Sequence, residues 1–296
     1  MNNILALDIG GSKLLCGIVS EDGKLLAESK KDFPCGYTLD ELKSSLAELA
    51  SPLINSFNPV SAGATIPGLC DPQKGLWVYA PKSGIKDFVI RSFVSEQFAI
   101  PLSIENDVNA CAVGEKKFGI CRDTDDFIWV TVSTGIGGSI FANGMLYSGH
   151  SGNAGEIGHI KVVRNGRLCG CGGKGCLESE ASGTGIAAKY CDLTGQALSA
   201  KEIAERAKNG DRISAAIYRE AGYLIGSALS SAANLLNPEK IVLGGGVAMD
   251  FPLLSPGINR ALEEGLFSAA NPELTIVKTG LGYNAALLGA AALTLL

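Results

Sequence analysis

Apolar residues along the chain fall into short runs and into longer stretches with helical spacing. The short runs are typical of buried strands, and they lie at 4–8, 14–20, 24–29, 60–65, 102–105, 127–134, 139–142, 240–243 and 274–278. Helices are expected at 38–57, 87–98, 108–118, several places within 180–236, and 284–295. The interleaving of strands with helices predicts an α/β protein.

Several helix ends and turns carry local signals. Thr38 followed by Glu41 is a capping-box pattern and predicts the start of the helix at 38–57. Asp87 is the expected cap of the helix at 87–98, and Asp22-Gly23 predicts a hairpin turn between the second and third strands.

The two halves of the chain open in the same way. Each begins with a strand, a glycine turn and a second strand, at 4–20 and at 127–142. This repetition suggests an internal duplication. No proline- or serine-rich linker separates the halves, so the polar stretch 117–125 is the best candidate for a boundary.

Composition narrows the class of protein. The 296 residues include 38 glycines, 46% hydrophobic residues and 19% charged residues. The apolar content argues against a disordered chain. The glycines gather at the ends of apolar runs, which indicates tight turns and close approach of the backbone to a ligand, and not a linker or collagen.

The net charge and the first residues of the chain indicate which binding partners and which cellular location to expect. The net charge of −5 and the absence of a lysine/arginine block argue against a nucleic-acid partner. The longest apolar run is too short to cross a bilayer, and the first residues lack the pattern of a secretory signal. A cytoplasmic protein with no membrane partner is expected.

Three glycine groups are candidates for binding a nucleotide. In Asp8-Ile9-Gly10-Gly11-Ser12-Lys13, backbone N–H groups could point at an anion, and Asp8 could hold a hydrated Mg²⁺. Residues 133–138 (STGIGG) stand at the equivalent place of the second half. For each of these two turns, the alternative is an ordinary hairpin turn with no ligand. This alternative is less convincing for two matching turns at equivalent places, so the pair predicts two phosphate-binding hairpins that face each other across a cleft. For 243–247, contact with an adenosine and helix–strand packing are equally supported.

A carboxylate follows the strand at 102–105. Asn106 and Asp107 stand where this strand runs into a helix. Asp107 could cap the helix. It could also act as a general base that accepts a proton from a substrate hydroxyl, because strand ends of α/β sheets face the crevice where ligands bind.

Three of the nine cysteines and one of the two histidines cluster in sequence. His159, Cys169, Cys171 and Cys176 supply the four ligands of a tetrahedral zinc site. A disulfide is the alternative, but it would leave one cysteine over. The remaining cysteines are expected to be small buried side chains: Cys16, Cys35, Cys70, Cys111, Cys121 and Cys191.

Two glutamates bracket this cluster. Glu156 and Glu178 could accept hydrogen bonds from sugar hydroxyls. The alternative for both is a solvated surface carboxylate.

These motifs, taken in order, resemble the ROK sugar kinases of the sugar kinase/Hsp70/actin superfamily. The resemblance covers nearly the whole chain and rests on DIGGSK at 8–13, ENDVNACAVGE at 105–115, VSTGIGGSI at 132–140, GEIGH at 155–159, CGCGGKGCLE at 169–178 and LGGGV at 243–247.

The resemblance implies a two-lobed actin-like ATPase (ribonuclease H-like) fold with a cleft between the lobes. Residues 1–118 would form a small N-terminal lobe, with the C-terminal helix 283–296 packing back on it. Residues 119–282 would form a larger lobe that carries the zinc loop 155–178. Lobe closure would exclude water from the cleft.

The resemblance also assigns roles. MgATP would bind at residues of the three glycine groups: Asp8, Gly10, Gly11, Ser12, Lys13, Thr134, Gly135, Gly137, Gly138, Gly244 and Gly245. Asp107 would be the catalytic base. The sugar would contact Gly68, Asn106, Asp107, Glu156, His159 and Glu178. A structural zinc would bind His159, Cys169, Cys171 and Cys176, so that His159 serves both metal and sugar.

The implied activity is ATP-dependent phosphorylation of the 6-hydroxyl of an aldohexose, glucose first and N-acetylmannosamine next. The GEIGH form favours an aldohexose over fructose. Ser12 replaces a threonine usual in the family, Ser139 replaces a glycine, and residues 79–84 lack the Asn-Leu-Pro-Gly-Trp run of family glucokinases.

The alternative is a sugar-binding regulator, or a module derived from a repressor, without kinase activity. Related repressors carry a DNA-binding domain before the kinase-like body. Here the first glycine turn begins at residue 8, which argues for the kinase. A homo-oligomer, dimer or tetramer, is expected from the family.

Overall fold

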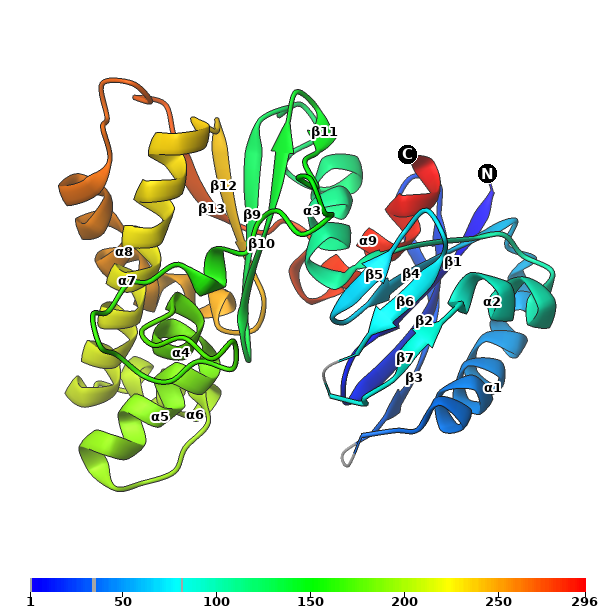
Figure 1. Ribbon diagram of the computed structural model, residues 1–296, viewed down its shortest axis with the longest axis horizontal. Coiled ribbons are helices and arrows are strands. Elements are labelled where there is room, and N and C mark those ends of the chain that lie inside the picture. Colours follow the sequence, from blue (N-terminus) through cyan, green and yellow to red (C-terminus); the bar gives the residue numbers. More distant parts are fainter. Residues whose placement is uncertain (1, 34–35, 81) are drawn as a thin grey trace. The chain divides into compact units, whose positions relative to one another are not determined.

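The computed structural model describes residues 2–33, 36–80 and 82–296, so that Cys35 and Pro81 lie outside the described residues. The chain forms two compact units, each containing a sheet and helices (Figure 1). The first unit is Met1–Asp123 with Tyr283–Leu296, and the second is Thr124–Gly282.

The first unit is built on a five-stranded sheet in the order β3-β2-β1-β4-β8. Its strands are β1 (Asn3–Ile9), β2 (Lys13–Ser20), β3 (Leu25–Asp32), β4 (Ser61–Ile66) and β8 (Leu102–Asn106). β1, β2 and β3 pair antiparallel, whereas β4 and β8 run parallel to β1. The carboxyl ends of β1, β4 and β8 therefore meet at one edge of the sheet.

The second unit repeats this arrangement with the order β11-β10-β9-β12-β13. Its strands are β9 (Phe127–Val132), β10 (Ile136–Ala142), β11 (Met145–Leu146), β12 (Lys240–Gly244) and β13 (Thr275–Lys278). The antiparallel and parallel pairings follow the same sequence as in the first unit. Both halves thus use one topology, as an internal duplication predicts.

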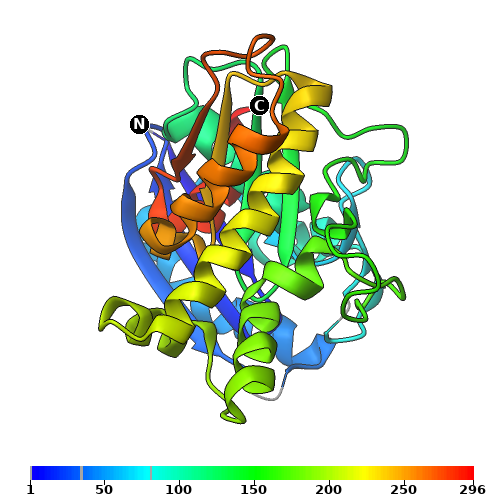
Figure 2. The ribbon, with the colours of Figure 1, turned by 90° about the vertical axis from the view of Figure 1, so that its left-hand side faces the viewer.

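Helices cover the sheets and complete a hydrophobic core in each unit. In the first unit these are α1 (Leu39–Phe57), α2 (Ile90–Phe98), α3 (Asp107–Phe118) and α9 (Ala285–Ala292). In the second unit they are α4 (Leu177–Ala181), α5 (Gly183–Thr194), α6 (Ala200–Lys208), α7 (Arg212–Leu236) and α8 (Phe251–Gly265), with α7 alongside α8 (Figure 2). Short 3₁₀ turns are Ile157–His159, Ala248–Asp250, Gly282–Asn284 and Leu293–Leu295.

The start of α1 confirms the predicted capping box. The Glu41 backbone N–H donates to Thr38 Oγ1 over 3.3 Å, and the Thr38 N–H donates to Glu41 Oε2 over 2.7 Å. Two backbone donors that lack helical partners are satisfied in this way.

The prediction for the next helix was wrong at its start. Asp87 does not cap it but lies in a short strand, β7 (Lys86–Phe88), with a φ of 50°. β7 pairs with β6 (Leu76–Tyr79), which pairs with β5 (Leu69–Asp71), and α2 begins only at Ile90. Strands of three or four residues are too short to show the alternation from which they could be predicted.

The scattered cysteines are less uniform than expected. Cys16, Cys111 and Cys121 are buried, as predicted, and Cys70 is half-buried. Cys191 is exposed on α5, which corrects its prediction as a core residue.

The carboxyl-terminal helix α9 packs against β1, β4 and α3 of the first unit. A Cβ on Gly63 of β4 would lie only 1.7 Å from the carbonyl oxygen of Ala290 on α9. The two backbones touch here, so position 63 of β4 has no room for a side chain.

Gly63→Ala should therefore lower the free energy of unfolding, by at least the roughly 1–3 kcal/mol typical of overpacking. Thermal unfolding followed by circular dichroism measures the effect. Gly170→Ala is the matched control, because a Cβ there meets no atom within 4 Å and Gly170 has no left-handed φ. Equal melting temperatures for Gly63→Ala and the wild type would contradict this packing.

Within the described residues, no helix combines the length and apolarity needed to span a membrane.

Candidate active site and metal-binding loop

The first glycine turn is tied to the neighbouring strand and to a tyrosine. Thr65 Oγ1 on β4 donates to Asp8 Oδ1 on β1 over 2.9 Å. The Gly10 N–H donates to the Lys13 carbonyl over 2.8 Å, and Tyr37 Oη donates to the Gly10 carbonyl over 3.0 Å. Burial raises the pKa of Asp8, against the lowering effect of the Thr65 hydrogen bond and the Lys13 charge. Thr65 was not anticipated from sequence, because a single polar residue in an apolar strand carries no motif.

Asn106, and not Asp107, is the cap of α3. Asn106 Oδ1 accepts from the Val108 N–H over 2.9 Å, while its Nδ2 donates to the Gly68 carbonyl over 3.0 Å. One amide side chain thus fixes both the start of α3 and the turn at Gly68, whose φ is 85°. The alternative role of Asp107 as the helix cap is therefore filled by the adjacent Asn106. Asp107 Oδ1 also accepts from the Val108 N–H, over 3.1 Å.

Asp107 is the first residue of α3, immediately after the end of β8. Burial, together with the negative charge of Asp8, raises the pKa of Asp107 from its ordinary 3.8 to about 6. A carboxylate with a pKa near neutrality is suited to general-base chemistry, because it is ionised at working pH yet accepts a proton readily.

Glu105 is a supporting residue that the sequence analysis did not single out. Its Oε1 accepts from the Asn106 N–H over 2.8 Å and from Asn109 Nδ2 over 3.2 Å. These bonds lock the strand–helix junction on either side of Asp107. Its place in the run from Glu105 to Asn109 was the only sequence signal for this role.

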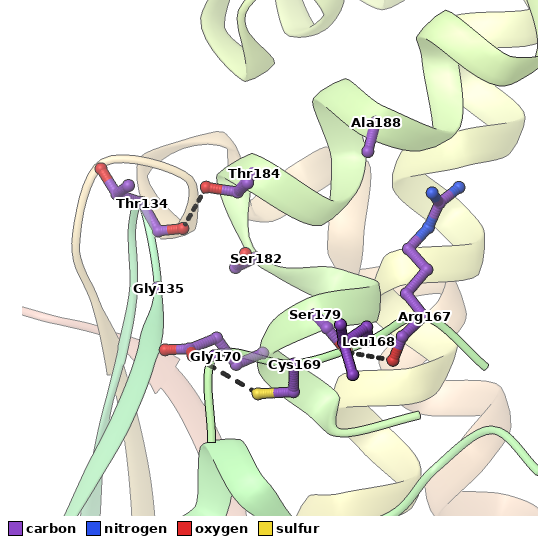
Figure 3. A pocket seen from close by; sticks show the side chains of 11 residues that line it. Thr134, Gly135, Arg167, Leu168, Cys169, Gly170, Ser179, Ser182, Thr184 and Ala188 are labelled. Carbon is purple, nitrogen blue, oxygen red and sulfur yellow. Dashed lines mark hydrogen bonds between the residues drawn. The ribbon is translucent and has the colours of Figure 1, made fainter. Parts of the chain in front are cut away.

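The second glycine turn joins β9 to β10 and rests on the start of α5. The Gly183 N–H donates to the Ser133 carbonyl over 2.7 Å, and Thr184 Oγ1 donates to the Thr134 carbonyl over 2.9 Å (Figure 3). The turn itself is closed by a bond of 2.9 Å from the Ser133 N–H to the Gly135 carbonyl.

Two glycines of this region, Gly138 and Gly155, allow two backbone segments to pack closely. A Cβ on Gly138 would lie 2.7 Å from the Gly155 carbonyl oxygen, and one on Gly155 would lie 2.4 Å from the Gly138 oxygen. β10 and the segment before the 3₁₀ turn therefore touch backbone to backbone. Ser139 is tolerated because its φ is not left-handed, although its buried hydroxyl has no hydrogen-bond partner among the described residues.

The third glycine group also has a packing role. A Cβ on Gly244 would lie 2.3 Å from the Trp129 ring, and Gly245 has a φ of 88°. Gly246 is the open position of the group, with Ser133 Oγ the nearest atom at 4.0 Å. Trp129 lies on β9, which pairs with β12, and a Cβ on Gly245 would lie 2.5 Å from the Val132 carbonyl oxygen at the end of β9. Packing between these two strands, and not the helix–strand packing offered as the alternative, therefore accounts for Gly244 and Gly245.

Three cysteine side chains and one histidine side chain of the second unit converge. One potential ligand atom from each of His159, Cys169, Cys171 and Cys176 lies within 4.8 Å of all the others. Cys171 Sγ and Cys176 Sγ are 3.6 Å apart, and Cys169 Sγ is 3.7 Å from His159 Nδ1.

These distances fit a tetrahedral metal ion better than a disulfide. Zn–S bonds of about 2.3 Å at tetrahedral angles place two sulfurs about 3.8 Å apart, whereas a disulfide requires about 2.05 Å. The described cysteines are all free. Three sulfurs and one imidazole nitrogen are also the donor set of a closed structural zinc site.

The comparisons with known proteins decide the family. The sequence model described as "ROK family" matches residues 4–295. The chain belongs to the ROK family. A glucokinase of Streptomyces coelicolor is 30% identical over 310 residues, which cover 98% of this chain and 97% of the relative. The E. coli regulator NagC is 30% identical over 284 residues, covering 91% of this chain and 70% of NagC.

The solved structures agree. A ROK family glucokinase from Streptomyces griseus, in complex with glucose and AMPPNP, is 29% identical and aligns with a TM-score of 0.86 over 99% of each chain. A ROK hexokinase from Thermus thermophilus is 29% identical, with a TM-score of 0.83 over 98% of this chain and 97% of that one. The predicted family and the α/β actin-like ATPase fold are confirmed.

In this ROK protein, each unit assembles its own group of candidate residues. The first unit brings Gly68, Asn106 and Asp107 together, with Asp8 near Asp107. The second unit brings the metal loop next to the Thr134 turn. There, a cavity of about 700 Å³ is lined by Thr134, Gly135, Cys169, Gly170, Glu178 and Thr184, among others (Figure 3).

The two glutamates that bracket the candidate metal ligands differ in their surroundings. Glu178 is half-buried, and its Oε2 accepts from the Ile136 N–H over 3.1 Å, so it is tied to the second glycine turn. Glu156 is exposed, with Oε2 3.7 Å from His159 Nε2. The surface-carboxylate alternative therefore fits the setting of Glu156 and not that of Glu178.

Proposed function

We propose that this chain is an ATP-dependent kinase that phosphorylates the 6-hydroxyl of an aldohexose, glucose first and N-acetylmannosamine next. The observation that carries the proposal is Asp107, a partly buried carboxylate at a strand end whose pKa is raised to about 6. Such a group can take the proton of a hydroxyl that attacks phosphorus.

In the proposed reaction, Asp107 accepts the proton of the 6-hydroxyl as that oxygen attacks the γ-phosphorus of MgATP in line. The bond from the γ-phosphorus to the bridging oxygen breaks, and ADP leaves. Asp8, whose charge contributes to the raised pKa of Asp107, would face the magnesium of the substrate through water. The phosphate-binding residues of the first unit would be Gly10, Gly11 and Ser12 in the turn and Lys13 at the start of β2. Those of the second unit would be Thr134 and Gly135 in the turn and Gly137 and Gly138, which lie in β10 and not in the turn expected from sequence.

The adenosine is assigned to the turn after β12, at Gly244 and Gly245. The tight packing of these two glycines leaves Gly246 as the position with open space above it. The backbone of this turn, and not a side chain, would then contact the nucleoside.

The proposed sugar ligands are Gly68, Asn106, Asp107, Glu156, His159 and Glu178. Asn106 has a second duty, because its amide already joins Gly68 to α3. Glu178, held by the Ile136 N–H, presents its carboxylate in a fixed direction, as recognition of sugar hydroxyls requires.

His159, Cys169, Cys171 and Cys176 would hold a structural zinc ion. Bound there, zinc would cross-link the loop and fix its side chains without taking part in the chemistry. His159 Nδ1 faces Cys169, so Nε2, on the side of Glu156, stays available to a sugar hydroxyl.

A coupled assay of ATP consumption over a panel of sugars tests the proposal. The panel contains glucose, N-acetylmannosamine, N-acetylglucosamine, fructose, allose and β-glucosides, with ATP alone as the blank. We expect sugar-dependent turnover, with glucose or N-acetylmannosamine the best substrate. Sugar binding by calorimetry without ATP consumption would contradict the kinase and favour the regulator that the likeness to NagC offers.

A further inference from the structure

Lys161 and Cys176 face each other across two paired segments of the metal loop. The residues form an antiparallel bridge, flanked by bonds of 2.9 Å from Val162 N–H to the Gly175 carbonyl and from Leu177 N–H to the Ile160 carbonyl. The Lys161 ammonium donates to Cys176 Sγ over 2.7 Å. Backbone and side chain of Lys161 therefore both hold one of the four candidate metal ligands.

The ammonium is held close to the loop. A Cβ on Gly173 would lie 2.2 Å from Lys161 Nζ and 3.5 Å from Cys171 Sγ. The absence of a side chain at position 173 thus leaves the space that Lys161 Nζ occupies. This places the cation near two of the three thiols.

The charge of the proposed centre needs such a cation. Zn²⁺ with three thiolates and a neutral imidazole carries a net charge of −1. Two carboxylates add to the negative potential, because Glu178 Oε1 lies 3.9 Å from Cys169 Sγ and Glu156 lies beside His159. A lysine that donates to a thiolate offsets this charge with a charge-assisted hydrogen bond.

Cys176 also controls a neighbouring element. It is the N-cap residue of α4, whose second residue is Glu178. A displacement of Cys176 would therefore move the carboxylate that is bonded to Ile136 N–H.

We propose that Lys161 is a positioning residue of the metal centre. Its ammonium balances the charge of the three thiolates, slows loss of the metal, and holds the beginning of α4 in place. This inference rests on the zinc centre of the proposed function.

Lys161→Met tests it, with Lys174→Met as the matched control. Lys174 is in the same loop and its removal changes the charge equally, but its side chain makes no hydrogen bond or ion pair among the described residues. Zinc is measured by elemental analysis, and its transfer to a chromophoric chelator is followed over time. Substitution of residues that support metal ligands costs 10–100-fold in affinity, so we expect about 10–100-fold faster zinc transfer from Lys161→Met.

Two further readouts separate this role from a general structural one. Lys161→Arg should restore slow zinc transfer at least in part, because it keeps a cationic donor. In the cobalt-substituted protein, the thiolate-to-cobalt absorption bands should shift in Lys161→Met and not in Lys174→Met.

Wild-type rates of zinc transfer from Lys161→Met would overturn the inference, as would equal acceleration by Lys174→Met. A wild-type protein that contains no zinc would overturn the metal centre itself. Sugar-dependent ATP consumption, measured on the same preparations, reports on the kinase proposal separately.

Discussion

Asp107→Asn should lower kcat for sugar phosphorylation by about 10²–10⁴-fold, the usual contribution of a general base. The amide has nearly the shape of the carboxylate and keeps an oxygen that can accept from Val108 N–H. It has no free base to take the proton of the sugar hydroxyl. The Kd for sugar, measured by calorimetry, should change much less than kcat.

The pH dependence of sugar phosphorylation by the wild-type protein should report the ionisation of Asp107. Burial and Asp8 raise the pKa of Asp107 from 3.8 to about 6, so the carboxylate is protonated in a growing fraction of molecules below pH 6. Because only the ionised form accepts a proton, kcat/KM should fall about tenfold per pH unit on the acid side. An aspartate with an ordinary pKa would hold activity down to about pH 4.

Asp71→Asn is the control for this prediction. It removes the same charge from the same unit, at a surface ion pair with Lys74 2.9 Å away, and should leave kcat unchanged. Near-normal turnover by Asp107→Asn would contradict the assignment of Asp107 as the general base. An activity plateau reaching pH 4 would contradict the raised pKa.

Cys176→Ser should remove the metal and most of the activity. The purified wild-type protein should contain about one zinc per chain, and the variant almost none, because a serine hydroxyl replaces a thiolate ligand. Without the ion, the loop loses its cross-link and the carboxylate of Glu178 loses its fixed position. A misplacement of about 1 Å in a binding group can cost about 100-fold in rate, so kcat/KM for the sugar should fall by about that factor.

Cys191→Ser is the matched control, because Cys191 is an exposed thiol on α5 of the same unit. It should retain zinc and activity. Treatment of the wild type with a strong chelator should reproduce the effects of Cys176→Ser, and added zinc should reverse them. A metal-free preparation with full activity would refute the structural zinc.

Much of the fold could be predicted because its signals are local. The apolar runs placed every strand of the two five-stranded sheets except the two-residue β11. Thr38 with Glu41 marked the start of α1 within one residue. The predictions failed where the local signal was weak or fitted more than one kind of structure. Asp87 has the chemistry of a helix cap, yet its neighbours Lys86 and Phe88 pair with β6, and this strand pairing outweighs a capping preference.

The candidate site residues were likewise predicted in part from local sequence, and in part they depend on contacts between distant segments. The residues from Glu105 to Asn109 marked the strand–helix junction, but which residue caps the helix depends on the Gly68 carbonyl, supplied by another segment. Two of the glycines first interpreted as nucleotide contacts are Gly138 and Gly244, which the structure shows in close contact with other backbone or with a tryptophan.

The sequence by itself determined the family, the order of the longer strands and helices, and the residue types at each glycine turn and in the loop that carries the candidate metal ligands. These follow from spacing along the chain, which sets periodicity, turns and ligand number. Only the tertiary structure decided the raised pKa of Asp107, the tie of Glu178 to Ile136 and the contact of Lys161 with Cys176. Burial, steric contact and Coulomb interaction depend on distances in space between residues that the chain keeps apart, so no local pattern encodes them.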